Sequence, residues 1–152
     1  MEQTIFDLMF EKFKINKPIR LIEFFSGYGS QALSMKYLGV SFEHYKTCEW
    51  AIKSIQAYKD IHFAEDNKDY SKDLDIDSIK TYLYEKGISS NYNEPMSKQQ
   101  VDRLGEQQAR TIYNNIQATH NLVNIQQVKG QDLEIKDTEQ YIYILTRFLA
   151  KI

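Results

Sequence analysis

An apolar run that breaks into closely spaced glycines constrains this chain more than any other feature. The run covers residues 19–25, Gly27 and Gly29 follow it, and an amphipathic segment begins at Ser30. This order is typical of a strand, a tight turn and the start of a helix. Backbone N–H groups at such a turn lack partners, and glycine has no Cβ to keep a ligand away. The pattern predicts a cofactor-binding turn, with an ordinary left-handed turn as the alternative.

A second strand and an acidic residue follow at a spacing that suits a nucleoside. Residues 40–47 have the character of a strand, Cys48, Glu49 and Trp50 come next, and residues 51–58 have helical character. A carboxylate at the end of the second strand can accept hydrogen bonds from both ribose hydroxyls of a nucleoside bound at the first turn. The indole of Trp50 can stack beside the base.

These segments resemble the motifs of DNA (cytosine-5) methyltransferases. Residues 23–31 (Glu-Phe-Phe-Ser-Gly-Tyr-Gly-Ser-Gln) resemble the first motif of that family, which holds S-adenosylmethionine. Residues 48–50 stand where the second motif places its ribose-binding Glu. Residues 129–133 resemble the third motif, whose Asp contacts the adenine amino group, and residues 141–146 resemble the fourth strand. The likeness is closest to bacterial and phage members with a helical insertion, and it covers nearly the whole chain.

The resemblance implies S-adenosylmethionine as the cofactor and a set of residues that bind it. These are Phe25, Ser26, Gly27, Tyr28, Gly29, Ser30, Gln31, Glu49, Trp50, Asp132 and Leu133. Two positions depart from the usual first motif, because Glu23 replaces an Asp and Ser30 replaces a Gly. Neither departure excludes the cofactor.

The family's catalytic cysteine is missing. In an intact relative a cysteine thiolate adds to C6 of a flipped cytosine, C5 takes the methyl group, and a base removes the C5 proton. The Pro-Cys pair should follow shortly after Thr146, where this chain has different residues at 147–152. Cys48, the single cysteine, ends an apolar strand, which predicts a buried inert thiol. No catalytic residue is predicted, and the chain is expected to be inactive alone.

Residues 147–152 have the pattern that a frameshift would produce. Residues 148–152 can be encoded as TTC-CTT-GCC-AAG-ATT, and a shift of one base upstream reads Ile-Pro-Cys-Gln-Asp. This is the family's nucleophile motif. We therefore expect residues 147–152 to be an out-of-frame tail, and the shifted frame to continue into a recognition domain. The DNA sequence of the gene checks this expectation.

The length and net charge of the chain agree with the cofactor-binding part of a methyltransferase. A chain of 152 residues has room for one domain, whereas a base-flipping methyltransferase also needs a recognition region. The expected layout is a single partial methyltransferase domain over residues 1–152. Residues 1–66 carry the first two motifs, 67–124 the insertion, and 125–146 the third motif and fourth strand. The net charge of −2 implies no basic surface for phosphates, so DNA binding by this chain alone should be weak or absent.

Several classes of site and location are disfavoured. One cysteine excludes an internal disulfide and a multi-cysteine metal cluster, which favours a reducing cytoplasm. His44, His62 and His120 lack metal-ligand spacing, so no metal is expected. Neither a leader nor an apolar run of membrane-spanning length is visible, so we expect no membrane insertion.

The predicted fold is α/β, a Rossmann-like class I methyltransferase domain. It should have three layers, an incomplete parallel sheet in the order 3-2-1-4, and a helical insertion. A helix is expected at residues 4–13, and another after the glycine turn that ends at Gly39.

The insertion is predicted to consist of helices. One should cover residues 75–86 and end at Gly87, a loop should follow at 89–95, and Ser97 with Gln100 forms a capping-box pattern. A later stripe of apolar residues predicts a further helix; it comprises Ala109, Ile112, Tyr113 and Ile116. The tyrosines of the insertion are interpreted as core or rim residues rather than base-stacking residues; they are Tyr82, Tyr84, Tyr92 and Tyr113.

Three classes of function stay open from the sequence. The chain is a truncated cytosine-5 methyltransferase, one subunit of a split enzyme, or a repurposed interaction protein such as a phage-encoded inhibitor. In the family the fourth strand is internal, so residues 141–145 are expected to present an unpaired edge here. Such an edge predicts self-association or a protein partner.

Overall fold

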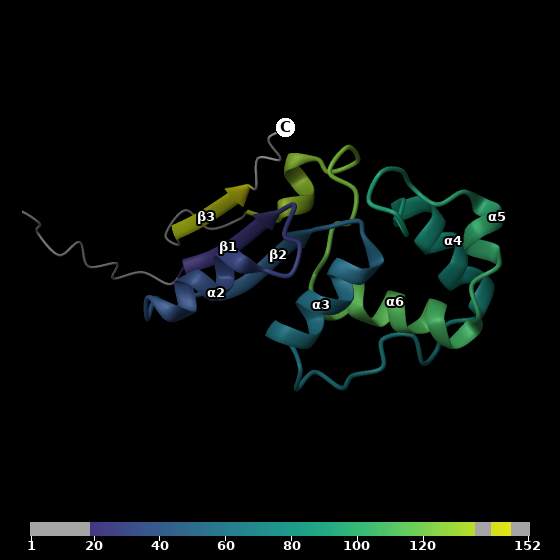
Figure 1. The fold of residues 1–152 in the computed structure, drawn as a ribbon, viewed down its shortest axis with the longest axis horizontal. Coiled ribbons are helices and arrows are strands. Elements are labelled where there is room, and N and C mark those ends of the chain that lie inside the picture. The colour runs from purple at the N-terminus through teal and green to yellow at the C-terminus, as the bar shows by residue number, and fades with distance from the viewer. Residues whose placement is uncertain (1–18, 136–140, 147–152) are drawn as a thin grey trace, which may run out of the picture.

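The protein has an α/β fold, with a small parallel sheet and several helices (Figure 1). The computed structural model describes residues 19–135 and the backbone of residues 141–146. The predicted opening helix at 4–13 and the predicted out-of-frame tail at 147–152 lie outside the described residues. No helix in the described part of the chain has the length and apolar character needed to cross a bilayer.

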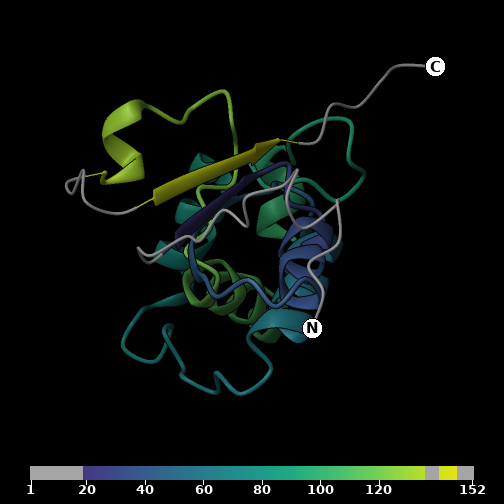
Figure 2. The same ribbon diagram turned by 90° about the vertical axis from the view of Figure 1, so that its left-hand side faces the viewer.

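The sheet is built around the apolar run. Strand β1 (Ile19–Phe24) lies in the centre, with β2 (Glu43–Cys48) on one side and β3 (Tyr141–Thr146) on the other, and both pairings are parallel. Figure 2 shows β3 alongside β1. Leu21 and Ile22 are almost completely buried, which is typical of a strand covered on both faces. Among the described strands, β3 lies at an edge of the sheet. That another protein chain pairs with this edge stays a prediction.

The segment that resembles the third motif, residues 129–133, contains no strand. Residues Gly130–Leu133 form a 3-10 helix, η1, instead. The segment is polar apart from Leu133, and the Asp132 carboxylate accepts a hydrogen bond from the Lys129 N–H at 2.7 Å, which stabilises a turn rather than a strand. A single parallel bridge between Asn121 and Thr47 lies on the edge of β2 away from β1.

The helices follow the strands in two groups. Helix α2 (Ser30–Tyr37) follows the glycine turn, and α3 (Ile52–His62) follows β2. Helices α4 (Ile76–Lys86), α5 (Lys98–Asp102) and α6 (Glu106–Ala118) lie within residues 67–124, the segment predicted as a helical insertion and called the insertion below. Helices α4 and α5 lie at the end of the molecule away from the sheet, and α6 runs from there to the side of α3 (Figure 1).

The local signals of the insertion are confirmed. Asp75 caps α4 by accepting from the Ser78 N–H at 2.8 Å, and Gly87 ends the helix in the left-handed region at φ +70°. Ser97 and Gln100 form the capping box of α5. The apolar stripe of α6 packs against both α4 and α3 in one buried cluster; its members include Ile55, Ile79, Leu83, Ala109, Ile112 and Ile116.

Candidate functional site

The glycine turn adopts the left-handed backbone that its sequence predicts. Gly27 has φ +55° and Gly29 has φ +83°, and Phe25 just before them has φ +54°. The Ser26 N–H donates to the Cys48 carbonyl at 3.3 Å, which ties the turn to the end of β2. The carboxyl ends of β1 and β2 therefore meet at one place, where ligands of open parallel sheets bind.

Glu49 connects this turn to the start of α3. Its Oε2 accepts from the Gly27 N–H at 3.0 Å, and its Oε1 accepts from the Ala51 N–H at 2.9 Å. A carboxylate has about four acceptor sites, so each oxygen of Glu49 retains capacity for another donor. The side chain is thus held in one orientation while it can still receive two hydroxyl hydrogen bonds.

Asn121 fixes the backbone of Glu49. Its Oδ1 accepts from the Glu49 N–H at 3.0 Å, and its Nδ2 donates to the Glu49 carbonyl at 3.0 Å. The same Oδ1 also accepts from the Val123 N–H at 2.8 Å. One buried side chain therefore takes the place of a neighbouring strand and joins β2 to the segment after α6.

A cavity of about 330 Å³, called the Glu49 cavity below, lies in front of these residues. This volume is in the range of small-molecule sites. Among the predicted site residues it is lined by Phe25, Gly27, Glu49 and Trp50. A Cβ added at Gly27 would meet nothing within 4 Å, so the backbone there faces open space. Residues that sequence reasoning did not place at the site complete the lining; they are Cys48, Ser54, Tyr92, Val123, Asn124, Ile125 and Gln126.

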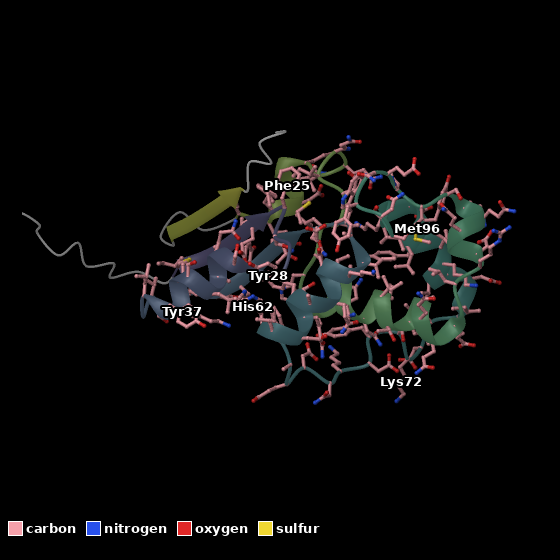
Figure 3. All side chains as sticks on the ribbon, viewed as in Figure 1. Phe25, Tyr28, Tyr37, His62, Lys72 and Met96 are labelled. Atoms are coloured by element: carbon pink, nitrogen blue, oxygen red, sulfur yellow. The ribbon has the colours of Figure 1, made fainter. Side chains whose placement is uncertain are left out.

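The other predicted site residues are not among those that line the cavity; they are Ser26, Tyr28, Gly29, Ser30, Gln31, Asp132 and Leu133. Ser26 is buried in the turn, and Tyr28 is exposed beside His62 (Figure 3). Ser30 and Gln31 belong to the first turn of α2. The carboxylate of Asp132 caps its own turn, and the structure does not bring it to the cavity.

Strained backbone is concentrated at the cavity. Five residues other than glycine have positive φ in the described part of the chain, and three of them, Phe25, Tyr92 and Val123, line it. Val123 has φ +66° and is the centre of a γ-turn closed by the Asn124 N–H and the Leu122 carbonyl at 3.0 Å. A β-branched residue is rare in this region, and strain of this kind clusters at ligand sites.

A buried polar network lies behind the glycine turn. Glu23 is 1% exposed, and its carboxylate accepts from the Ala32 N–H at 3.2 Å and from the Tyr58 hydroxyl at 2.5 Å. Because that hydroxyl uses its hydrogen on Glu23, its oxygen accepts from His44 Nδ1 at 2.8 Å. Burial raises the pKa of Glu23, although the hydrogen bonds from Tyr58 and Ala32 oppose the shift.

The geometry requires His44 to be neutral. Its Nδ1 donates to Tyr58, and its Nε2 is buried without a hydrogen-bond partner among the described residues. A second proton would therefore sit on Nε2 in surroundings that offer no acceptor. Burial, with smaller contributions from His62 and Lys36, lowers the pKa of His44 to about 4.

His62 joins this network to the glycine turn. Its Nε2 lies 3.0 Å from the Tyr28 carbonyl, to which it donates, and its Nδ1 lies 3.2 Å from Lys36 Nζ. The ring packs directly against Gly29, so that a Cβ at this position would overlap His62 Nε2 and lie 2.7 Å from Tyr58 Cε2. Gly29 is therefore required both by its φ and by the close approach of two rings.

Cys48 is unsuited to nucleophilic chemistry. It is 2% exposed, and its thiol donates to the Val123 carbonyl at 3.4 Å. Burial, with a smaller contribution from the Glu49 charge, raises the pKa of the thiol to about 12. At neutral pH the residue is a protonated thiol, as the sequence interpretation predicts.

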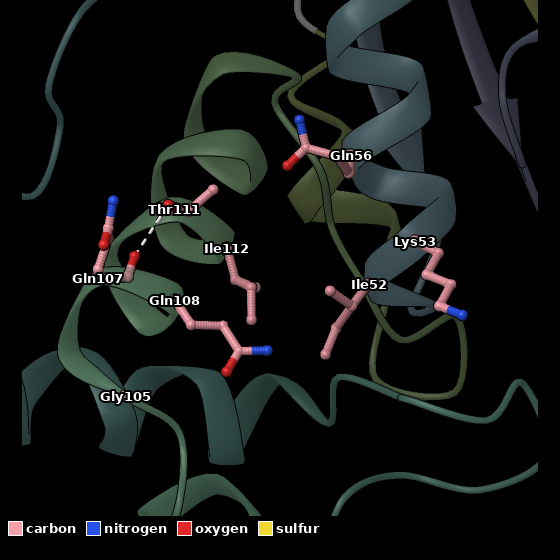
Figure 4. A pocket seen from close by; sticks show the side chains of 8 residues that line it. All are labelled: Ile52, Lys53, Gln56, Gly105, Gln107, Gln108, Thr111 and Ile112. Carbon is pink, nitrogen blue, oxygen red and sulfur yellow. Dashed lines mark hydrogen bonds between the residues drawn. The ribbon is translucent and has the colours of Figure 1, made fainter.

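A second hollow, of about 670 Å³, lies between α3 and α6 (Figure 4). Its lining includes Ile52, Gln56, Gln108 and Ile112. It is more open than the Glu49 cavity and contains no cluster of titratable groups, so it offers no arrangement for catalysis. No group of three metal-ligating side chains occurs within the described ranges.

The comparisons with known proteins do not identify a relative. No protein-family model matches the sequence, and the search of curated proteins found no match. The functional argument therefore rests on the residues and their geometry.

Proposed function

We propose that this chain binds S-adenosylmethionine in the Glu49 cavity and forms the cofactor-binding part of a DNA (cytosine-5) methyltransferase. The observation that carries the proposal is the double hydrogen bond of the Glu49 carboxylate to the Gly27 and Ala51 N–H groups, beside Trp50 and in front of an open cavity. The motif resemblance predicts a ribose-binding Glu at this position. A three-layer domain with the strand order 3-2-1-4 belongs to the same proposal.

The residues of the cavity fit a nucleoside. Glu49 retains acceptor capacity for two ribose hydroxyls, and Gly27 leaves room for the ligand against the turn. Phe25 and Trp50 offer flat apolar surfaces for a base. In this proposal Gln126 contacts the polar edge of the base, because Gln126 lines the cavity and Asp132 does not. Asn124 also lines the cavity, but its Oδ1 already accepts from the Gln126 N–H at 3.0 Å.

The proposed role is binding rather than complete catalysis. A bound S-adenosylmethionine supplies the methyl group, and this chain holds and orients it. The attack on cytosine C6 needs a thiolate, and the single cysteine is buried with a pKa of about 12. We therefore propose that DNA and the nucleophile are engaged by other parts of the enzyme, and that the chain alone transfers no methyl group.

Replacing Glu49 by alanine is expected to weaken binding of S-adenosylhomocysteine by roughly 1–3 kcal/mol, because charged hydrogen bonds to the ribose are lost. Trp50 is the single tryptophan and lines the cavity, so its fluorescence reports binding. Glu43→Ala is the matched control, since Glu43 is exposed at the other end of β2. Circular dichroism verifies that both variants fold. Equal affinities for wild type, Glu49→Ala and Glu43→Ala would refute the assigned role of Glu49.

A further inference from the structure

Tyr92 stands apart from the other tyrosines of the insertion. Tyr82 and Tyr113 pack edge to face on the insertion core, as predicted. Tyr92 instead lines the Glu49 cavity, is 53% exposed, and has φ +68°. Its hydroxyl lies 3.5 Å from Ser54 Oγ on α3. The loop after α4 thus brings an aromatic ring to a cavity whose other walls come from the ends of β1 and β2, from α3 and from the segment after α6.

The loop that carries Tyr92 is bonded to the segment that carries Trp50. The Ser89 N–H donates to the Trp50 carbonyl at 2.7 Å, and the Ser89 carbonyl accepts from the Ile52 N–H at 2.9 Å. Ser89 is completely buried, and its Oγ accepts from the Tyr92 N–H at 3.0 Å. The positions of the two aromatic residues are therefore coupled through one short parallel bridge.

A second set of hydrogen bonds holds Tyr92 in its left-handed conformation. Asn91 Oδ1 accepts from the Asn93 N–H at 3.0 Å and from the Glu94 N–H at 3.2 Å, which closes the loop around Tyr92. This backbone favours Gly or Asn, and a bulky residue there is strained. A half-exposed ring gains little from burial to offset that strain. Folding alone therefore gives no reason for tyrosine at this position, whereas contact with a ligand does.

We propose that Tyr92 is a cofactor-contacting residue that forms an aromatic wall for the nucleobase, so that the insertion takes a direct part in binding. The inference rests on the proposed function of the Glu49 cavity. It assigns the cavity a planar heteroaromatic ligand group, which Trp50 and Tyr92 contact from two segments tied together at Ser89. Stacking on an aromatic side chain stabilises a bound base by an amount that corresponds to about ten-fold in affinity or more.

The test compares Tyr92→Asn, Tyr92→Phe and the wild type by calorimetric titration with adenosine and with S-adenosylhomocysteine. Asparagine accepts the left-handed backbone, so Tyr92→Asn should unfold at an equal or higher temperature while it binds both ligands about ten-fold more weakly. Tyr92→Phe keeps the ring and should bind within about two-fold of wild type. Tyr84→Ala is the control, because Tyr84 is an exposed tyrosine on α4 that does not line the cavity.

The outcomes separate the two proposals. Unchanged affinity of a folded Tyr92→Asn variant, with a wild type that binds, would overturn the role of Tyr92 and leave the proposed function standing. Equal losses in Tyr92→Asn and Tyr84→Ala would also overturn it, because the effect would not be specific to the cavity. A folded wild type that binds neither ligand would overturn the proposed function and this inference together.

Discussion

Gly29→Ala is expected to lower the free energy of unfolding by about 2–5 kcal/mol. Two costs add at this position. An alanine at φ +83° pays about 1–2 kcal/mol for the left-handed conformation. Its Cβ would also overlap the His62 ring and approach Tyr58 to 2.7 Å, and overpacking of this kind costs about 1–3 kcal/mol. Urea unfolding followed by circular dichroism measures the difference.

Two further variants separate the costs. Gly39→Ala has a similar φ of +69° but no atom within 4 Å of its Cβ, so it should lose only the conformational part. In a His62→Ala background the Gly29→Ala substitution should cost less, because the nearest obstacle has gone. Equal losses for Gly29→Ala and Gly39→Ala would show that the rings behind the turn do not restrict it. The double variant Gly29→Ala/His62→Ala can still be compared with His62→Ala if Gly29→Ala alone fails to fold.

Acidification from pH 7 to pH 4 is expected to remove up to about 3 kcal/mol of stability through His44. Its pKa is lowered from 6.5 to about 4 in the fold, so the unfolded chain binds the proton more tightly. The contribution of the neutral ring is fully present above pH 6.5 and is lost as the pH falls toward 4. Each pKa unit corresponds to about 1.4 kcal/mol. Unfolding free energies measured across this range test the prediction.

The His44→Asn variant isolates this effect from the other titrating groups. An asparagine Nδ2 can replace the donor to Tyr58, and the side chain does not titrate. Burial also lowers the pKa of His62, which adds to the loss, whereas the raised pKa of Glu23 opposes it as the pH falls toward 4.5. The unfolding free energy of wild type relative to His44→Asn should therefore fall by up to about 3 kcal/mol between pH 7 and pH 4. A difference that stays constant from pH 7 to pH 4 would contradict a neutral buried His44.

The sequence predicted the helices of the insertion well because their ends carry local signals. Asp75, Gly87 and the Ser97–Gln100 capping box act within a few residues of the chain, and the structure forms each of them. Strand β2 begins at Glu43 rather than at residue 40, and α3 extends to His62 rather than to residue 58. No capping residue marks these boundaries, and contacts distant in the sequence determine them.

The contribution of residues 123–126 to the cavity could not be predicted in the same way. The motif likeness placed the adenine contact at Asp132, whereas the structure brings residues 123–126 to the cavity. The Asn121 side chain bonds the backbone N–H and carbonyl of Glu49, as a neighbouring strand would. No periodicity in the sequence reveals such a role. Tyr92 was interpreted as a core or rim residue because helical spacing does not show where a loop directs a ring. The one local signal was the pair of asparagines at 121 and 124 after an amphipathic helix.

Calorimetric titration of the folded wild-type chain with S-adenosylhomocysteine tests the central claim most directly. The account predicts one site per chain, competition by S-adenosylmethionine, and no binding of methionine alone, because the ribose and base supply the contacts in the Glu49 cavity. Binding should fall in Glu49→Ala and remain in Glu43→Ala. The absence of binding heat at several temperatures, from a chain that unfolds cooperatively, would contradict the assignment of this cavity to the cofactor.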